Sequence, residues 1–176
     1  PATTAAAFTT NVVKATSVTR NMEIMAKGIK INGIAINSGN ANACTGELGI
    51  KSNIEMAEAY ANCLGVDKDT ILTASTGVIG ATFPIDTVVT GIKNTFPKLG
   101  SKREDALLAA EAIMTTDTYS KEVAVEFEIG GKTVHMGGMA KGSGMICPNM
   151  ATMLAFVTTD VAINKDLLNK ALKDDI

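Results

Sequence analysis

The stretch KEVAVEFEIGGKTVHMGG, residues 121–138, alternates apolar and polar side chains before a glycine pair. Apolar residues occupy every second position from Val123 onward, with glutamates mostly between them, which is the period-two pattern of a β-strand. Gly130 and Gly131 suit a two-residue hairpin turn. The stretch therefore predicts an antiparallel β-hairpin. The alternate apolar positions are Val123, Val125, Phe127 and Ile129.

Helical and strand patterns lie on both sides of this hairpin. Helical spacing of apolar residues is found in residues 47–65, 83–100, 101–116 and 164–175. Short β-branched runs predict strands over residues 32–38, 69–76 and about 152–159. Helices and strands with at least one antiparallel hairpin make the fold class mixed α/β (α+β). No linker or repeat divides the chain, so residues 1–176 are expected to form a single domain.

Local signals set the expected ends and faces of these helices. Gly65 is expected to end the first one, Pro84 to begin the second, and Asn164 to cap the last. Ser101 and Glu104 have the spacing of a capping box. The apolar face expected for the first helix is formed by Leu48, Ile50, Ile54, Ala57, Ala61 and Leu64.

Composition excludes several classes of protein. The net charge is −2 with no block of like charge, which argues against nucleic acid or an anionic membrane as the main partner. No apolar run reaches the length of a membrane span. The three cysteines are widely spaced, which predicts no disulfide framework and favours a reducing, cytoplasmic compartment. The single histidine, His135, is expected at the surface, and without more histidines no metal site is expected.

Weaker candidates for a reactive site are set aside on the same grounds. Cys44 and Cys147 have no base near them in the sequence, so each is interpreted as a small buried residue. Gly142 and Gly144 lack the third glycine of a dinucleotide-binding loop, so no cofactor is expected.

A second stretch, KGSGMICPNMATMLAFVTTD at residues 141–160, points to chemistry at Thr152. A threonine in a strand is ordinary, but here a loop of glycines and Pro148 precedes it, which allows an unusual backbone path. A hydroxyl nucleophile needs a base, and a threonine freed as a new N-terminus carries its own α-amine. The pKa of that amine is roughly 7.7–8.0, which suits it to act near neutral pH.

Five motifs together resemble the glutamate N-acetyltransferase family of arginine biosynthesis, also called the ornithine acetyltransferases. They occur in family order and cover nearly the whole chain: FTTNVVKA, NSGNANACTG, STGVIG, IMTTDT and KGSGMICPNMATMLAFVTTD. The resemblance implies a layered fold of helices over packed β-sheets, of the N-terminal-nucleophile acetyltransferase type. It also implies a precursor that cuts itself between Ala151 and Thr152, after which Thr152 carries the acetyl group.

The resemblance assigns further roles to residues of this chain. Thr76 and Gly77 take the place of the family's oxyanion hole, and Thr115 and Lys141 that of its substrate contacts. The implied reaction moves acetyl from N-acetylornithine to glutamate, and some members of the family also use acetyl-CoA. From the residues alone, Gly77 would equally serve as a turn after a strand, and Lys141 would be an exposed loop lysine.

Family members continue well beyond the cleavage site, so residues 1–176 are interpreted as an internal piece of a longer precursor. The expected partner is the C-terminal half of that precursor, in a hetero-oligomer of cleaved chains. The piece alone is expected to be inactive, with uncovered apolar residues at Leu154, Phe156, Leu168 and Leu172. The alternatives are an amidohydrolase or aminopeptidase of the same nucleophile type, and a non-catalytic assembly fragment.

Overall fold

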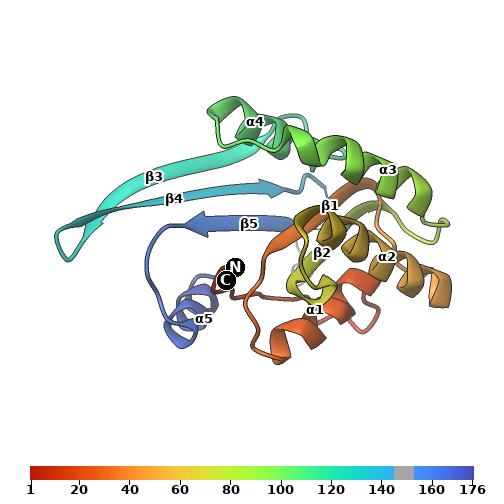
Figure 1. Cartoon of the computed structure of the whole chain (residues 1–176), viewed down its shortest axis with the longest axis horizontal. Coiled ribbons are helices and arrows are strands. Elements are labelled where there is room, and N and C mark those ends of the chain that lie inside the picture. The colour runs from red at the N-terminus through yellow and green to blue at the C-terminus, as the bar shows by residue number, and fades with distance from the viewer. Residues whose placement is uncertain (145–152) are drawn as a thin grey trace.

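The computed structural model describes residues 1–144 and 153–176, and Figure 1 labels the strands and helices that they form. The strands are β1 (Gly33–Asn40), β2 (Ile71–Val78), β3 (Lys121–Ile129), β4 (Lys132–Lys141) and β5 (Leu154–Thr159). The α-helices are α1 (Thr16–Ala26), α2 (Gly46–Leu64), α3 (Ile85–Thr95), α4 (Arg103–Ala112) and α5 (Lys165–Asp174). Two short 3₁₀ helices are η1 (Lys68–Thr70) and η2 (Phe96–Lys98).

The strands form two sheets. β1 and β2 pair in parallel, with Gly33 opposite Ile71 and Asn40 opposite Val78. β4 lies between β3 and β5 in an antiparallel sheet, and the β3–β4 hairpin extends beyond the rest of the molecule (Figure 1). The hairpin turn is the predicted glycine pair, and both glycines have a positive φ.

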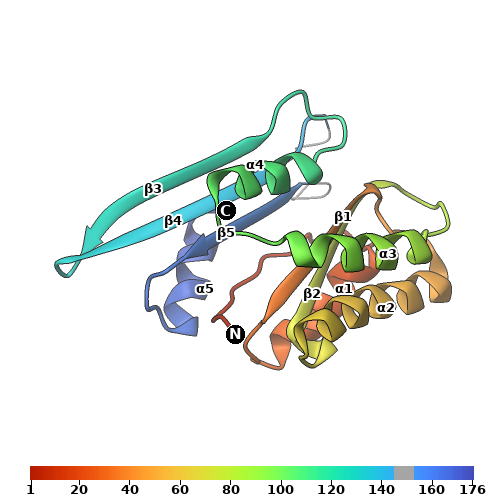
Figure 2. The same cartoon turned by 45° about the horizontal axis from the view of Figure 1, so that its top comes forward.

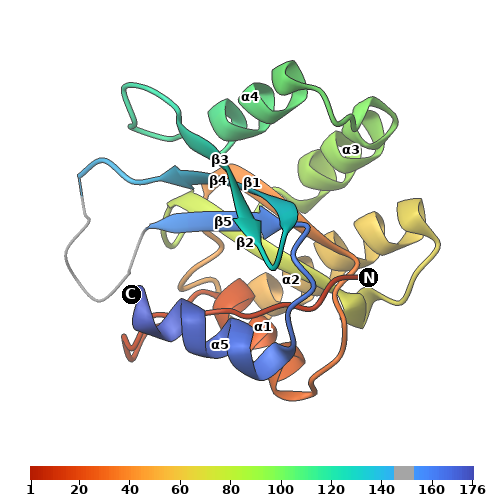
Figure 3. The same ribbon diagram turned by 90° about the vertical axis from the view of Figure 1, so that its left-hand side faces the viewer.

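Helices cover both sides of the strands. In Figure 3 the strands occupy the middle of the molecule, with α3 and α4 on one side and α1 and α5 on the other. One apolar core joins β1 and β2 to α2 and α3, and a smaller one joins β2 to α1. Figure 2 shows α2 and α3 beside this pair of strands. The predicted class, mixed α/β with helices layered over sheets, is confirmed.

The first long helix, α2, ends as predicted but buries a different face. Gly65 follows it in the left-handed conformation, with φ of 68°. Leu48 and Ile50, however, are exposed, whereas Gly49 and Asn53 are buried. The expected face was wrong in this half of the helix, because Gly49 approaches the side chains of the preceding loop too closely for any larger residue.

The caps of the later helices were predicted with mixed success. Asn164 caps α5, since its Oδ1 accepts from Leu167 N at 2.9 Å. The cap of α4 lies one residue later than the expected Ser101–Glu104 pair, because Asp105 accepts from the backbone N–H of Lys102.

Candidate functional site

Lys141 joins three separate parts of the chain. It is the last residue of β4, and its Nζ donates to Thr76 Oγ1 at 3.1 Å and to Thr115 Oγ1 at 2.8 Å. Thr76 lies near the end of β2, and Thr115 follows α4. The structure therefore brings together three of the residues that the resemblance singles out.

The burial of Lys141 differs from what its sequence context suggests. The residue is only 5% exposed, so the interpretation as an exposed loop lysine was wrong. Its nitrogen contacts hydroxyl groups, and no carboxylate of the described residues forms an ion pair with it. A buried ammonium with no carboxylate beside it leaves an uncancelled positive charge at the end of β4.

Thr76 and Gly77 occupy consecutive positions inside β2. Thr76 is buried opposite Ser38, and Gly77 lies opposite Gly39 with φ of 132°. Gly77 is thus part of the parallel sheet, and the alternative of a turn after the strand was wrong. Its backbone N–H and the Thr76 hydroxyl are the donors that the resemblance assigns to the oxyanion site.

Asp117 is a functional candidate that the sequence reasoning missed. Its side chain is 1% exposed and accepts from Lys121 Nζ at 2.7 Å and from the backbone N–H groups of Gly142, at 2.8 Å, and Thr115, at 3.3 Å. The bond from Lys121, with these backbone donors, holds the pKa of Asp117 well below its usual range. The signal in the sequence was a carboxylate among the hydroxyls of the IMTTDT motif.

The loop at residues 115–117 therefore runs along the end of β4. Thr115 contacts Lys141, Asp117 contacts Gly142, and the hydroxyls of Thr116 and Ser143 lie 2.7 Å apart. This contact holds the chain immediately before residues 145–152. The proposed cleavage pair, Ala151–Thr152, lies outside the described residues, as does Cys147.

The NSGNANACTG motif holds the chain just after Gly77. The side chain of Asn40 donates to Thr82 O at 3.1 Å, and Ala41 N donates to Val78 O at 2.9 Å. Within the loop, the side chain of Asn42 is fully buried and donates to a helix carbonyl at 2.9 Å. Cys44 in the same loop is exposed, so its interpretation as a buried residue was wrong.

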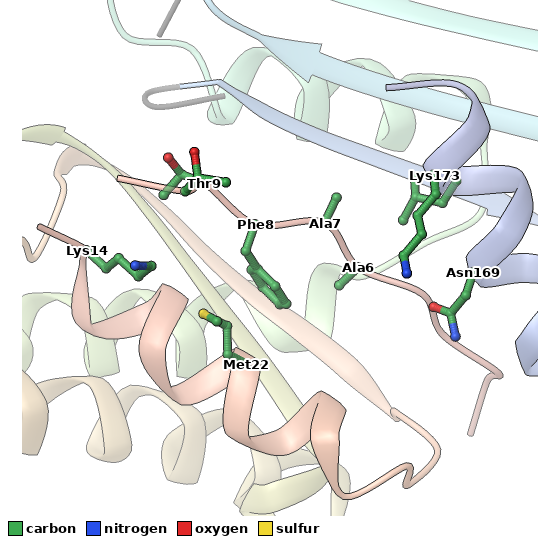
Figure 4. Close-up of a pocket in the computed structure, with 10 residues that line it drawn as sticks. Ala6, Ala7, Phe8, Thr9, Lys14, Met22, Asn169 and Lys173 are labelled. Carbon is green, nitrogen blue, oxygen red and sulfur yellow. The ribbon is translucent and has the colours of Figure 1, made fainter. Parts of the chain in front are cut away.

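A separate cavity of about 400 Å³ lies between the N-terminal segment, α1 and α5 (Figure 4). Phe8 and Met22 contribute its apolar wall, and Lys173 and Asn169 of α5 lie at one end. None of the residues that meet at Lys141 lines this cavity.

Among residues 1–144 and 153–176, no three His, Cys, Asp or Glu side chains are grouped to bind a metal ion. His135 is exposed on β4, as predicted, and contacts Asp160 and Glu126. In the described parts of the chain, no helix is both long enough and apolar enough to cross a membrane.

Two solved structures share this fold. One is the arginine biosynthesis bifunctional protein ArgJ of Bacillus halodurans, 40% identical, with a TM-score of 0.79 over 86% of this chain and 78% of that one. The other is the ornithine acetyltransferase of Mycobacterium tuberculosis, determined in complex with ornithine, 35% identical, with a TM-score of 0.76 over 88% of this chain and 79% of that one. The fold is thus that of the ornithine acetyltransferases.

Sequence comparison identifies the family itself. The ArgJ family model matches residues 1–176, and the chain belongs to the ArgJ family. The arginine biosynthesis bifunctional protein ArgJ of Caldanaerobacter subterraneus is 50% identical over 97% of this chain, and that of Thermotoga neapolitana is 48% identical over 98%. The chain spans 42% and 43% of the length of these two relatives. The family membership expected from the five motifs is confirmed.

Proposed function

We propose that the full-length protein cleaves itself between Ala151 and Thr152 and then transfers acetyl from N-acetylornithine to glutamate. The Thr152 hydroxyl attacks the acetyl carbonyl carbon, the bond to the ornithine nitrogen breaks, and ornithine leaves with the proton. The glutamate amine then attacks the carbonyl carbon of the acetyl-Thr152 ester, the ester C–O bond breaks, and a proton from the amine restores the Thr152 hydroxyl. Two steps through a covalent intermediate predict ping-pong kinetics.

The convergence of Lys141, Thr76 and Thr115 carries this proposal. A buried ammonium suits an amino acid carboxylate or the charge that develops on a reacting carbonyl. The three side chains come from segments far apart in the sequence, and the contacts hold the chain at Gly142, close before the proposed cleavage pair. Ornithine bound to the Mycobacterium tuberculosis relative supports a substrate of the ornithine type.

The lengths of the related proteins support cleavage. Nearly the whole of this chain matches only 42% of the length of the Caldanaerobacter relative. By contrast, 86% of this chain matches as much as 78% of the length of the solved Bacillus halodurans chain. That solved chain is therefore only about half as long as the full-length relative. Separate halves are what self-cleavage near the middle of a precursor produces. On this proposal the chain binds the rest of its precursor in a hetero-oligomer, needs no metal or cofactor, and accepts acetyl-CoA as a second acetyl donor.

Replacement of Thr152 in the full-length protein tests the proposal. Thr152→Ala is expected to remain uncleaved by intact mass and to transfer no acetyl group, because one hydroxyl serves both steps. Thr152→Ser keeps a hydroxyl and is expected to retain part of each activity. Thr158→Ala, which removes an exposed threonine of β5, is the matched control and should be cleaved normally. Normal transfer by Thr152→Ala would rule out this nucleophile.

The same assay separates the rival functions. Acetyl-glutamate formed from N-acetylornithine supports the transferase. Release of acetate without acetyl-glutamate would indicate an amidohydrolase, in which water accepts the acyl group. A cleaved full-length protein with neither product would indicate a non-catalytic assembly role.

A further inference from the structure

The ammonium of Lys141 determines how two hydroxyl groups are oriented. A lysine ammonium has three donors and no acceptor, so the oxygens of Thr76 and Thr115 must both accept from it. A threonine hydroxyl otherwise rotates to suit its neighbours, as donor or acceptor. Here each hydroxyl proton has to point away from Lys141.

We propose that Lys141 is a positioning residue that fixes the Thr76 hydroxyl as a donor to the carbonyl oxygen of the reacting acetyl group. This rests on the proposed function, in which Thr76 stabilises the oxyanion. The positive charge also polarises the Thr76 O–H bond, and hydrogen bonds strengthen one another in this way along a chain. Lys141 thereby acts on the reaction through Thr76 without touching the reacting oxygen.

The surroundings of Thr76 already fix its backbone. The rotation of its hydroxyl group is therefore the main motion that Lys141 restricts. The backbone of Thr76 is held in β2 opposite Ser38, and the residue is 6% exposed. Lys141 is equally fixed, because the next backbone N–H, that of Gly142, donates to Asp117. A preorganised donor of this kind needs no reorientation as charge develops on the substrate.

The geometry distinguishes this role from simple binding of a substrate carboxylate. Two of the three ammonium protons of Lys141 are already used on hydroxyls, which leaves at most one for a substrate carboxylate. A lysine that only bound a carboxylate would affect substrate affinity and act independently of Thr76. A lysine that orients Thr76 would affect turnover and lose its effect once the Thr76 hydroxyl is gone.

A double-mutant cycle on the full-length, cleaved enzyme tests this difference. Thr76→Val is expected to lower kcat by roughly 10²–10³-fold, the loss typical of one oxyanion donor. Lys141→Met is expected to lower kcat by roughly tenfold or more, because a Thr76 hydroxyl that is no longer oriented stabilises the oxyanion less well. The double variant should have nearly the kcat of Thr76→Val alone. Effects that multiply, with a raised KM for Lys141→Met, would overturn the proposal in favour of carboxylate binding.

Thr115→Val supplies the matched background, since it removes the other hydroxyl that Lys141 contacts. Lys141→Met should still lower kcat there, because the Lys141–Thr76 pair is intact; loss of the effect would also overturn the proposal. Should Lys141→Met fail to fold, Lys141→Gln takes its place in the same cycle. A wild-type enzyme that transfers no acetyl group would instead overturn the proposed function, and this inference with it.

Discussion

The backbone of Gly77 lies so close to Gly39 that a Cβ atom on Gly77 would be 2.2 Å from the Gly39 carbonyl carbon. Gly77 also has φ of 132°, a conformation that residues with a side chain rarely adopt. The two glycines are partners in the parallel β1–β2 pair, so neither backbone can move away alone. The proposed oxyanion site is therefore built where only glycine fits.

Gly77→Ala should consequently destabilise the fold as well as the site. The strained φ alone costs about 1–3 kcal/mol, and the overlap with Gly39 adds to it. Gly91→Ala is the matched control, because Gly91 lies inside α3 with open space around it and should gain about 0.5–1 kcal/mol. Urea unfolding of the full-length variants measures both, and equal stability of the two would contradict the close contact.

Asp117 should hold the site together through its charge. Asp117→Asn keeps an oxygen acceptor but loses the ion pair with Lys121, and we expect it to lower the free energy of unfolding by about 1–3 kcal/mol at pH 7. Asp175→Asn, at the exposed end of α5, is the control and should change little. Urea unfolding at pH 7 compares the two variants. An Asp117→Asn variant as stable as its control would contradict a stabilising role for the Asp117 charge.

The contribution of Asp117 should also depend on pH in a defined direction. Its pKa is lowered in the folded state, so its contribution is fully present above the unfolded pKa of about 3.9. That contribution is lost as the pH falls from there toward the lower pKa of the folded state. Wild type and Asp117→Asn should therefore converge in stability at acid pH. A difference in stability that grew on acidification would contradict a lowered pKa of Asp117 in the folded state.

The contribution of His135 to stability should depend on pH in the opposite direction. Its Nδ1 lies 2.8 Å from Asp160 Oδ2 and its Nε2 lies 3.0 Å from Glu126 Oε2, and these carboxylates, Asp160 most of all, raise the pKa of His135. Any stabilisation by the charged ring is present below the unfolded pKa of about 6.5 and is lost as the pH rises through the folded pKa.

Proton NMR of the 176-residue chain measures this directly, since His135 is its single histidine. We expect a titration midpoint above 6.5, which Asp160→Asn should lower more than Glu126→Gln, because Asp160 contributes more to the shift. A wild-type midpoint at or below 6.5 would contradict the ion pairs.

Local patterns in the sequence predicted local structure well. The turn at Gly130 and Gly131, the cap at Asn164 and the end of α2 at Gly65 each depend on a few neighbouring residues. The exposure of Leu48 was not predictable in this way, because the buried face of α2 is set by the loop and sheet that it packs against.

The candidate site depended on contacts between distant residues. Thr76 and Lys141 are separated by 65 positions, and no period or spacing in the sequence connects them. Only the resemblance to a family placed both in one site, and it still left Asp117 out. Burial of Lys141 follows from the meeting of β2, β4 and the loop after α4, which a single sequence does not reveal.

One face of the antiparallel sheet carries exposed apolar side chains. Val123 and Val157 are each 65% exposed and lie opposite Gly138 from its two sides. Val125, 48% exposed, continues the row along β3. The four residues expected from the sequence to be uncovered are instead half-buried. They are Leu154, Phe156, Leu168 and Leu172.

Because contiguous exposed apolar surface promotes association, the 176-residue chain alone should self-associate through this face of the sheet. Val123→Thr combined with Val157→Thr should reduce that association, since threonine suits a strand but adds a polar group. Leu99→Thr, at an exposed residue after η2, is the control and should leave association unchanged. Light scattering over a range of concentrations measures the effect, and a wild-type chain that stays monomeric throughout would contradict it.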